Sequence, residues 1–276
     1  MAAGDLQSGG AVSANAGVTT VLVLGGTSEA RALAAELTDR PGLRVISSLA
    51  GRVRNPVLPP GEVRIGGFGG VQGLADWARA EAVDAMVDAT HPFAERISAH
   101  AVAACKQAGL PLLRLTRPGW QVQEGDDWHD AASLADAAAI LPPLGTRVFL
   151  TTGRQGLSAF AALHRLWFLI RCVDAPSGAM PANREVLLAR GPYTRDAERA
   201  LMRRFAIHVL VTKDSGGSLT AGKLAAARDL GIPVVIIRRP DASPAPSAAG
   251  VGDAVSWVLG QIPVRARRPP AHSAGE

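Results

Sequence analysis

The chain has 276 residues, which is longer than one typical domain, so one large or two medium domains are expected. Its two cysteines have no metal-ligand spacing, so we expect no metal site, and so few cysteines fit a reducing compartment best. The sequence has no apolar run of about 20 residues, and residues 1–17 lack the pattern of a secretory signal. These features predict a cytoplasmic protein, and the formal net charge of +5 suits an anionic ligand.

The first half of the chain alternates apolar runs with helical patterns. Hydrophobic residues make up 47% of the chain and aromatic residues only 4%, which favours helix-covered parallel sheets built from Ala, Val, Leu and Ile. Strands are expected at 21–24, 43–48, 62–65, 85–89 and 111–116, and helices at 29–38, 74–82 and after Pro92, with Pro92 in the first helical turn. This order is typical of a mostly parallel sheet.

The second half repeats the alternation. Strands are expected at 147–151, 167–173, 186–189, 208–212 and 234–237, and helices at 156–163, 194–205, 218–230 and 253–259. We therefore predict an α/β fold of two Rossmann-like domains, with mostly parallel sheets, an interdomain cleft and a junction near Pro142 and Pro143. The predicted divisions are a disordered segment at 1–17, domains at 18–142 and 143–263, and a disordered tail at 264–276.

The stretch after the first strand has the composition of a phosphate-binding turn. Gly25 and Gly26 carry no side chain that would obstruct an anion, and Thr27 or Ser28 can cap the following helix. A helix N-terminus attracts phosphate through its unpaired N–H groups and its macrodipole. The motif is G-G-x-x-x-A, not G-x-G-x-x-G, so an ordinary strand-to-helix corner fits this stretch equally well.

The end of the second strand bears on the choice of dinucleotide. NAD sites of the Rossmann type place an acid there to hold the ribose 2′-hydroxyl. The segment 46–52 contains no acid, and Ser48 with Arg52 could hold a 2′-phosphate instead. NADP(H) is favoured over NAD(H) if a dinucleotide binds, although Arg52 alone is also compatible with a surface cation.

Other polar residues follow the strands of both halves. His91 lies in a Thr-His-Pro turn, where it could be a general acid, a ligand contact or a structural helix cap. Lys213 and Asp214 precede two glycines and could face a ligand or form an internal ion pair. Three arginines also follow strands, namely Arg117, Arg154 and Arg238. Since ligands of open parallel sheets bind beyond the carboxyl ends of the strands, these residues predict a basic cleft.

Three catalytic motifs are excluded. The segment 217–223 imitates a Walker A loop, but Leu224 stands where the magnesium-binding hydroxyl is needed. Tyr193 is the only tyrosine, and Ala197 four residues later rules out a Tyr-x-x-x-Lys pair. No G-x-S-x-G elbow occurs.

Six segments match a known family in sequence and in order. They are LGGTSEA (24–30), SLAGR (48–52), DATHPFA (88–94), RPGW (117–120), TTGR (151–154) and TKDSGG (212–217). With them the chain resembles the precorrin-6A reductases of cobalamin biosynthesis. The resemblance implies an NADPH-dependent oxidoreductase acting on a CH–CH group, which reduces a ring double bond of precorrin-6A to give precorrin-6B without flavin or metal. It also implies that 18–142 binds NADPH and 143–263 binds substrate.

The resemblance and the strand-end positions together give an expected site. The cofactor set is Gly25, Gly26, Thr27, Ser28, Glu29, Ala30, Ser48, Arg52 and Thr90. The catalytic set is Lys213, His91 and Asp214, with the proton coming from Lys213, His91 or water. The substrate set is Arg117, Arg154, Lys213 and Arg238, because cations would neutralise the carboxylates of a polyanionic precorrin macrocycle.

Partners and alternatives complete these expectations. We expect no nucleic-acid or membrane partner, and transient contact with neighbouring pathway enzymes is compatible with the resemblance. One alternative is a cobalt-precorrin-6A reductase of the anaerobic route, which would share the motifs. The other is a non-catalytic NADP-binding regulatory module.

Overall fold

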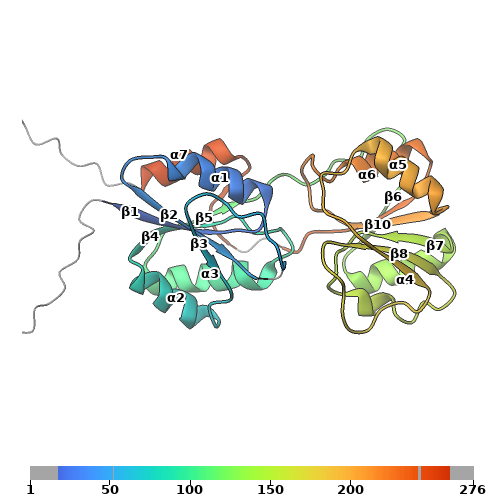
Figure 1. Cartoon of the computed structure of the whole chain (residues 1–276), viewed down its shortest axis with the longest axis horizontal. Helices are drawn as coiled ribbons and strands as arrows, with labels where there is room; N and C mark the ends of the chain where they lie inside the picture. Colours follow the sequence, from blue (N-terminus) through green and yellow to red (C-terminus); the bar gives the residue numbers. More distant parts are fainter. Residues whose placement is uncertain (1–17, 52, 242–243, 262–276) are drawn as a thin grey trace, which may run out of the picture.

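The protein contains two separate six-stranded parallel sheets, each covered by helices on both faces (Figure 1). The computed structural model describes residues 18–51, 53–241 and 244–261. Every strand pairing among these residues is parallel. The predicted fold class is therefore confirmed. The expected disordered ends at 1–17 and 264–276 lie outside the described residues.

The first unit is built around the sheet with strand order β12-β5-β4-β1-β2-β3. Its strands are β1 (Thr19–Leu24), β2 (Leu43–Leu49), β3 (Glu62–Ile65), β4 (Val83–Asp88), β5 (Leu112–Leu115) and β12 (Ser247–Ala248). One face packs on α1 (Ser28–Thr38) and α7 (Val251–Gly260), and the other on α2 (Val71–Ala80) and α3 (Glu95–Ala108).

The second unit has the same spatial pattern, in the order β6-β11-β10-β7-β8-β9. Its strands are β6 (Trp128–Ala131), β7 (Arg147–Leu150), β8 (Trp167–Cys172), β9 (Arg184–Leu188), β10 (Val209–Lys213) and β11 (Val234–Ile237). The helix α4 (Leu134–Leu144) and the 3₁₀ helix η1 (Leu157–Phe160) cover one face, and α5 (Arg195–Arg204) and α6 (Gly222–Asp229) cover the other.

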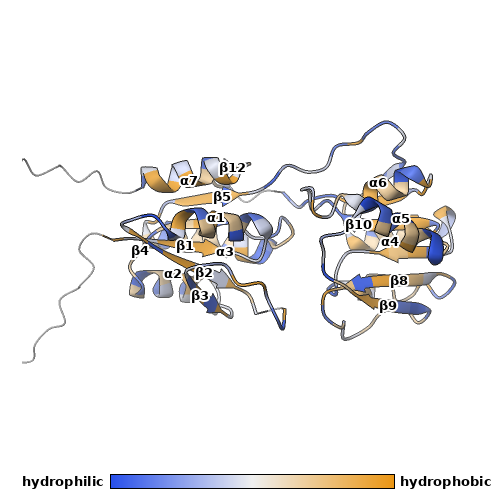
Figure 2. Cartoon of the chain, turned by 45° about the horizontal axis from the view of Figure 1, so that its top comes forward, coloured by the Kyte–Doolittle hydropathy of each residue, from blue (hydrophilic) through white to orange (hydrophobic). Residues whose placement is uncertain are grey.

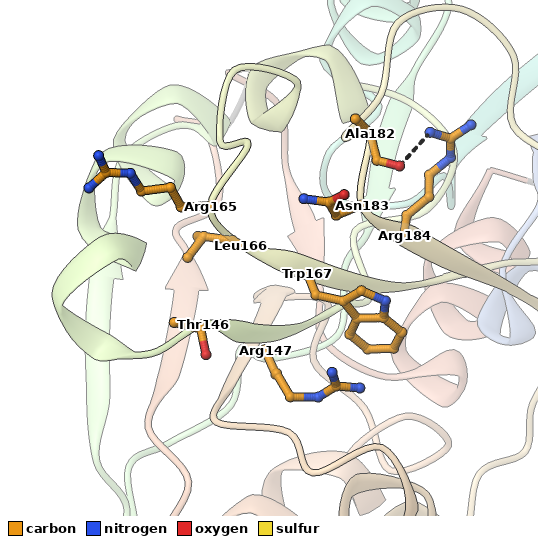
Figure 3. A pocket seen from close by; sticks show the side chains of 8 residues that line it. All are labelled: Thr146, Arg147, Arg165, Leu166, Trp167, Ala182, Asn183 and Arg184. Carbon is orange, nitrogen blue, oxygen red and sulfur yellow. Dashed lines mark hydrogen bonds between the residues drawn. The ribbon is translucent and has the colours of Figure 1, made fainter.

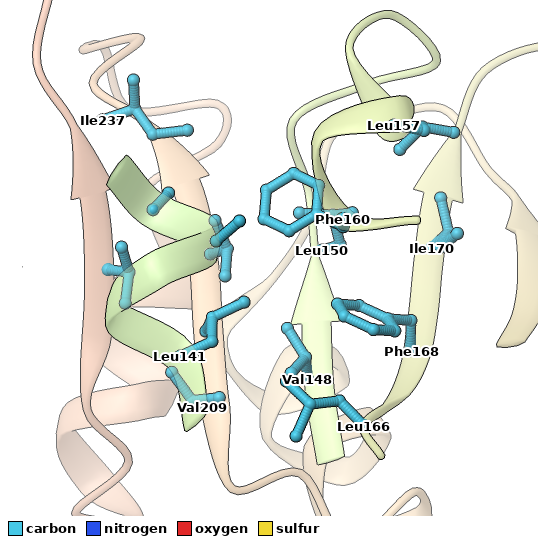
Figure 4. Packing of buried hydrophobic residues seen from close by; sticks show 14 of the residues in the cluster. Leu141, Val148, Leu150, Leu157, Phe160, Leu166, Phe168, Ile170, Val209 and Ile237 are labelled. Atoms are coloured by element: carbon cyan, nitrogen blue, oxygen red, sulfur yellow. The ribbon is translucent and has the colours of Figure 1, made fainter. Parts of the chain in front are cut away.

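The cores consist of aliphatic strands sandwiched by helices, as the composition predicts. In Figure 2 the strands are mainly hydrophobic, whereas the helices also carry hydrophilic positions. Figure 4 shows Leu141 of α4 beside Val209 of the second sheet, and the buried rings of Phe160 and Phe168 belong to the same hydrophobic cluster. Those two ring centroids lie 6.0 Å apart. Both faces of the central strands are buried, which explains why their sequences are continuous apolar runs.

Each sheet takes one outermost strand from a chain segment that was expected to belong to the other domain. Strand β6 lies within 18–142 but pairs with β11 of the second sheet. Strand β12 lies within 143–263 but pairs with β5, and α7 packs on the first sheet. The proposed junction is also wrong, because Pro142 and Pro143 lie inside α4. Neither β6 nor β12 was among the strands expected from hydrophobic patterning, so the two crossings of the chain between the units were not predicted.

Three other elements differ from their expected bounds. Helix α3 begins at Glu95, because residues 91–94 form a turn closed by the 2.8 Å bond from Ala94 N to the His91 carbonyl. Helix α6 begins at Gly222 instead of 218, and only the short η1 forms in the region 156–163. Among the described residues, no helix combines the length and the apolar character that a membrane crossing needs.

Candidate active site

Residues that follow the carboxyl ends of the strands in one sheet contact residues in the same position of the other sheet. In the first sheet the strand order reverses around β1, which lies between β2 and β4, and in the second around β7, between β8 and β10. Ligands of open α/β sheets bind at such switch points. His91, after β4, lies 3.1 Å from the hydroxyl of Ser215, after β10, and Arg117 Nε donates to the Ser215 carbonyl at 2.6 Å. The two switch points therefore face each other.

The turn from β1 to α1 is fixed by backbone and hydroxyl contacts. Gly25 N donates to the carbonyl of Ser48 at 2.9 Å, which ties the turn to the end of β2. Gly26 has φ of +112°, and no atom lies within 4 Å of the position that a Cβ would take, so the turn is open on that side. Thr27 caps α1 by accepting from Ala30 N at 3.1 Å and donates to the Ala89 carbonyl at 2.7 Å. Ala30 is buried in the core.

Glu29 and Arg117 form an ion pair at the start of α1. Arg117 Nη1 lies 2.6 Å from Glu29 Oε2, which also accepts from the Ser28 hydroxyl at 3.0 Å. Burial would raise the pKa of Glu29, but a hydrogen bond from its own backbone N–H and the charge of Arg117 outweigh burial and hold that pKa below its usual value. Glu29 is therefore an anion at neutral pH, placed where the helix macrodipole favours negative charge.

The turn after β4 positions Thr90 and His91. Thr90 donates to the buried carboxylate of Asp88 through its hydroxyl at 2.7 Å and its backbone N–H at 3.1 Å. His91 Nδ1 accepts from Phe93 N at 3.3 Å, so the ring proton belongs on Nε2, which faces Ser215. Burial, with the positive charges of Arg117, Lys213 and Arg239, lowers the pKa of His91 to about 4. The imidazole is therefore neutral at pH 7.

The turn after β10 contains Lys213, Asp214 and Ser215. Burial lowers the pKa of Lys213, while the charge of Glu95 opposes that effect, and the ammonium lies 5.2 Å from the centroid of the Phe93 ring. Asp214 accepts from Trp120 N at 3.0 Å and pairs with Arg239 at 3.3 Å. Asp214 is therefore paired with Arg239 and not with Lys213, which differs from the internal ion pair of Lys213 and Asp214 that the sequence left open.

Arg239 holds the crossing segment 117–120 against the second unit. Its Nε donates to the Asp214 carbonyl at 2.9 Å and its Nη1 to the Arg117 carbonyl at 2.7 Å. Gly216 has φ of +65°, and a Cβ there would collide with the Pro118 carbonyl and the Arg239 guanidinium. Close packing of backbone on backbone therefore requires glycine at this position.

A pocket of about 380 Å³ opens between the β1–α1 turn and the loop that follows β10. Six of the expected site residues line it: Gly26, Thr27, Ser28, Glu29, His91 and Arg117. The opposite wall is formed by residues 216–220, and this loop was not part of the expected site. The sequence signal that could have identified this loop is its pair of adjacent glycines, Gly216 and Gly217. Both adopt positive φ in the structure.

The remaining expected residues do not line this pocket. Ser48 is buried at the end of β2. Thr90 and Lys213 are not among the lining residues, although Thr90 directly precedes the lining residue His91. Arg154 is exposed after β7, and Arg238 points to Asp130 at 3.8 Å with 64% of its side chain exposed. Arg52 lies outside the described residues. Arg239, the neighbour of Arg238, was not in the expected site. It is nevertheless the arginine that donates to the carbonyls of Asp214 and Arg117, between the two units.

A second, open pocket lies at the amino end of the second sheet (Figure 3). Three arginines line it, and Arg147 stacks on Trp167 at 4.0 Å from the ring centroid. In Figure 3 the guanidinium groups of Arg165 and Arg184 point away from each other, and Arg184 donates to the carbonyl of Ala182. These cations do not converge on one point, so this pocket has no focused anion site.

Comparison with known proteins identifies the family. The family model described as precorrin-6x reductase CbiJ/CobK matches residues 20–259. A precorrin-6A reductase of Rhodococcus erythropolis is 59% identical over 242 residues, covering 87% of this chain and 98% of that protein. Another, of Mycobacterium tuberculosis, is 53% identical over 247 residues, covering 88% and 98%.

A solved structure agrees with the family match and confirms the resemblance seen in the sequence. The structure described as CobK precorrin-6A reductase aligns with a TM-score of 0.84 and 43% identity, covering 88% of this chain and 97% of that chain. Since the family model spans both sheets and most of the sequence, the chain belongs to the precorrin-6x reductase family.

Proposed function

We propose that the protein reduces precorrin-6A to precorrin-6B with NADPH, and that the reaction takes place where the two units meet. The observation that carries this proposal is the pocket between the glycine turn of the first switch point and the loop beside Lys213 of the second. One wall has the features of a phosphate site and the other lies next to cations. A dinucleotide and a polyanionic macrocycle could therefore approach each other there.

The residues at the first switch point are compatible with NADPH, which supplies the hydride when bound. Gly26 leaves the backbone of the turn open, and α1 begins directly behind it. Residues 47–51 contain no acid that would repel a 2′-phosphate. Ser48 and Arg52 would hold that phosphate, the segment 25–30 the pyrophosphate, and Thr90 and His91 the nicotinamide end.

Lys213 is the stronger candidate for the proton donor. Its lowered pKa makes the ammonium a better acid than that of an exposed lysine, and Nζ would deliver the proton to the ring. His91, whose pKa of about 4 keeps it neutral, would act through its Nε2–H as a hydrogen-bond donor. Replacement of Lys213 by Met should lower kcat by about 100-fold, whereas His91→Gln should affect KM more than kcat.

Substrate carboxylates would be held by cations on the side of the second unit. Arg154 and Arg238 follow β7 and β11, and Lys213 ends β10, so all three lie at the carboxyl edge of the second sheet. Charge-assisted bonds to carboxylates would orient the macrocycle and neutralise its charge. In this proposal the first sheet, with β12 and α7, binds the cofactor, and the second sheet, with β6, binds the substrate.

The decisive experiment follows the nicotinamide absorbance of NADPH while precorrin-6A is added. Oxidation that depends on the macrocycle supports the proposal. NADPH binding without oxidation would instead support the regulatory module. The same assay with cobalt-loaded substrate tests the anaerobic alternative, and a preference for the cobalt form would overturn the assignment to precorrin-6A.

The choice of cofactor has its own test. Arg52→Ala should weaken binding of NADPH much more than binding of NADH, because only NADPH carries the 2′-phosphate. Equal weakening of both would remove the 2′-phosphate role from Arg52. The cytoplasmic location and the contacts with neighbouring pathway enzymes stay predictions.

A further inference from the structure

The carboxylate of Glu29 occupies the place where an anion would bind at the start of α1. It accepts hydrogen bonds from its own backbone N–H, from the Ser28 hydroxyl at 3.0 Å and from Arg117 Nη1 at 2.6 Å. A helix N–H, a hydroxyl and a guanidinium are also the donors that proteins use for phosphate. The carboxylate of Glu29 therefore binds the same types of donor that bind phosphate in proteins.

The same carboxylate faces the pocket. Glu29, Ser28 and Arg117 all line it, together with Gly26 on the side where the turn is open. The side chain of Glu29 is 23% exposed and that of Arg117 is 15% exposed, so the ion pair is partly shielded from water. At this depth a second anion would be repelled by the carboxylate more strongly than at the surface.

Arg117 connects this ion pair to the second unit. Its Nε donates to the Ser215 carbonyl at 2.6 Å, and Arg239 binds its backbone carbonyl at 2.7 Å. The guanidinium is therefore held in place even when Nη1 loses its carboxylate partner. A phosphate that replaced Glu29 would find Arg117 already positioned.

We propose that Glu29 is an intramolecular stand-in for a cofactor phosphate, which the pyrophosphate of the dinucleotide must displace from Arg117 and from the start of α1. The inference rests on the proposed cofactor site and adds to it a positioning residue that lowers cofactor affinity. Glu29 keeps Arg117 paired in the free protein and competes for the same donors when the cofactor leaves. Cofactor binding therefore replaces the Glu29 carboxylate by a phosphate at Arg117, instead of adding a phosphate to an unpaired guanidinium.

The test compares Glu29→Gln with the wild-type full-length protein and with Glu36→Gln. Glu36 is an exposed residue on the same helix, so its replacement removes the same charge away from the pocket. Dissociation constants are measured for NADPH by fluorescence and for inorganic pyrophosphate by calorimetry, below the melting temperature of each variant. Glu29→Gln should bind both about tenfold more tightly, because a nearby like charge is gone, and Glu36→Gln should match the wild type.

A second measurement uses the wild type, so it does not depend on the folding of a variant. The pKa of Glu29, followed by carbon NMR of its carboxyl group, should rise when pyrophosphate binds, since the carboxylate then loses Arg117 and gains a like charge. An unchanged pKa, or pyrophosphate affinity that is equal or weaker in Glu29→Gln, overturns the inference. If NADPH fails to bind but pyrophosphate binds more tightly to Glu29→Gln, the inference stands and the proposed cofactor is wrong.

Discussion

The two switch points share a strand order but present different chemistry. After β1 the chain turns through Gly25 and Gly26 and enters α1, which has 11 residues and a side-chain cap from Thr27. After β7 it passes Gly153 and Gly156, both with positive φ, and forms only the four-residue η1. The first edge therefore offers a helix N-terminus, whereas the second offers side-chain cations. Topology places a ligand site, and the residues that follow the strand decide which ligand it suits.

The units also differ in how they bury charge. In the second unit Arg171 and Glu198 are both buried and form a bidentate pair with distances of 2.5 and 2.9 Å. In the first unit Arg114 of β5 and the buried Asp88 of β4 form a looser pair, with 3.6 Å between Nε and Oδ2. The buried Lys223 lies near the tight pair, and its pKa is lowered to about 7 mainly by burial. Glu198 is thus the carboxylate that compensates buried cations in the second unit.

The largest expected effect is the loss of that carboxylate. Glu198→Ala leaves Arg171 without its buried partner and should lower the free energy of unfolding by about 3–5 kcal/mol. Urea denaturation measures the change. Glu185→Ala, on the exposed side of β9 in the same unit, should change it by about 0.5 kcal/mol or less. Similar losses in both variants would mean that the buried pair is no more important than a surface charge.

The next prediction concerns the pH dependence of the free energy of unfolding, to which His91 contributes from its place between the two units. The pKa of His91 is depressed from 6.5 to about 4, so the unfolded chain binds more protons between these values. The stabilisation is complete above pH 6.5 and is lost as the pH falls towards 4, by up to about 3 kcal/mol. His91→Gln, which can still donate to Ser215, should lack this loss. Parallel stability curves for the two proteins would show that His91 titrates normally.

Hydrophobic patterning predicted ten of the twelve strands in the described part of the chain, but neither of the edge strands β6 and β12. The apolar runs that became β1 and β11 are unambiguous because both faces of these strands are buried. The segment that became β6 reads Trp-His-Asp-Ala and has no such pattern, since it lies at a sheet edge. Its place beside β11 depends on contacts across more than 100 residues, which local periodicity does not encode.

Part of the candidate site was also predictable, from the positions at which the apolar runs end. Strand-end position identified Thr27 and His91, which line the pocket, and Lys213, which precedes the loop that forms its opposite wall, because the end of an apolar run is visible in sequence. It did not distinguish Arg238 from Arg239, of which only Arg239 reaches the Arg117 carbonyl at 2.7 Å. Nor did it show that Glu29 pairs with Arg117, since that contact requires the two units to be placed against each other.

A smaller effect tests the close contact at the second switch point. Gly216→Ala introduces a Cβ that collides with Pro118 and Arg239, whereas Gly178→Ala, at a similar φ of +83°, meets no atom within 4 Å. The control should lose about 1 kcal/mol from backbone strain alone. Gly216→Ala should lose about 1–3 kcal/mol more, from overpacking. Thermal unfolding measures both, and equal losses would show that the loop moves aside freely.

The smallest effect compares two helix caps that differ in their distance from the pocket. Thr27 caps α1 beside the pocket, and Thr194 caps α5 by accepting from Ala197 N at 3.3 Å, at an exposed site in the second unit. Replacement of either by Val should cost about 1 kcal/mol of stability, because a helix N–H loses its acceptor. Only Thr27→Val should also weaken NADPH binding, since Thr27 additionally holds the turn through the Ala89 carbonyl. Fluorescence titration and thermal unfolding of both variants separate the two roles, and weaker NADPH binding in Thr194→Val would mean that the units do not divide cofactor and substrate between them.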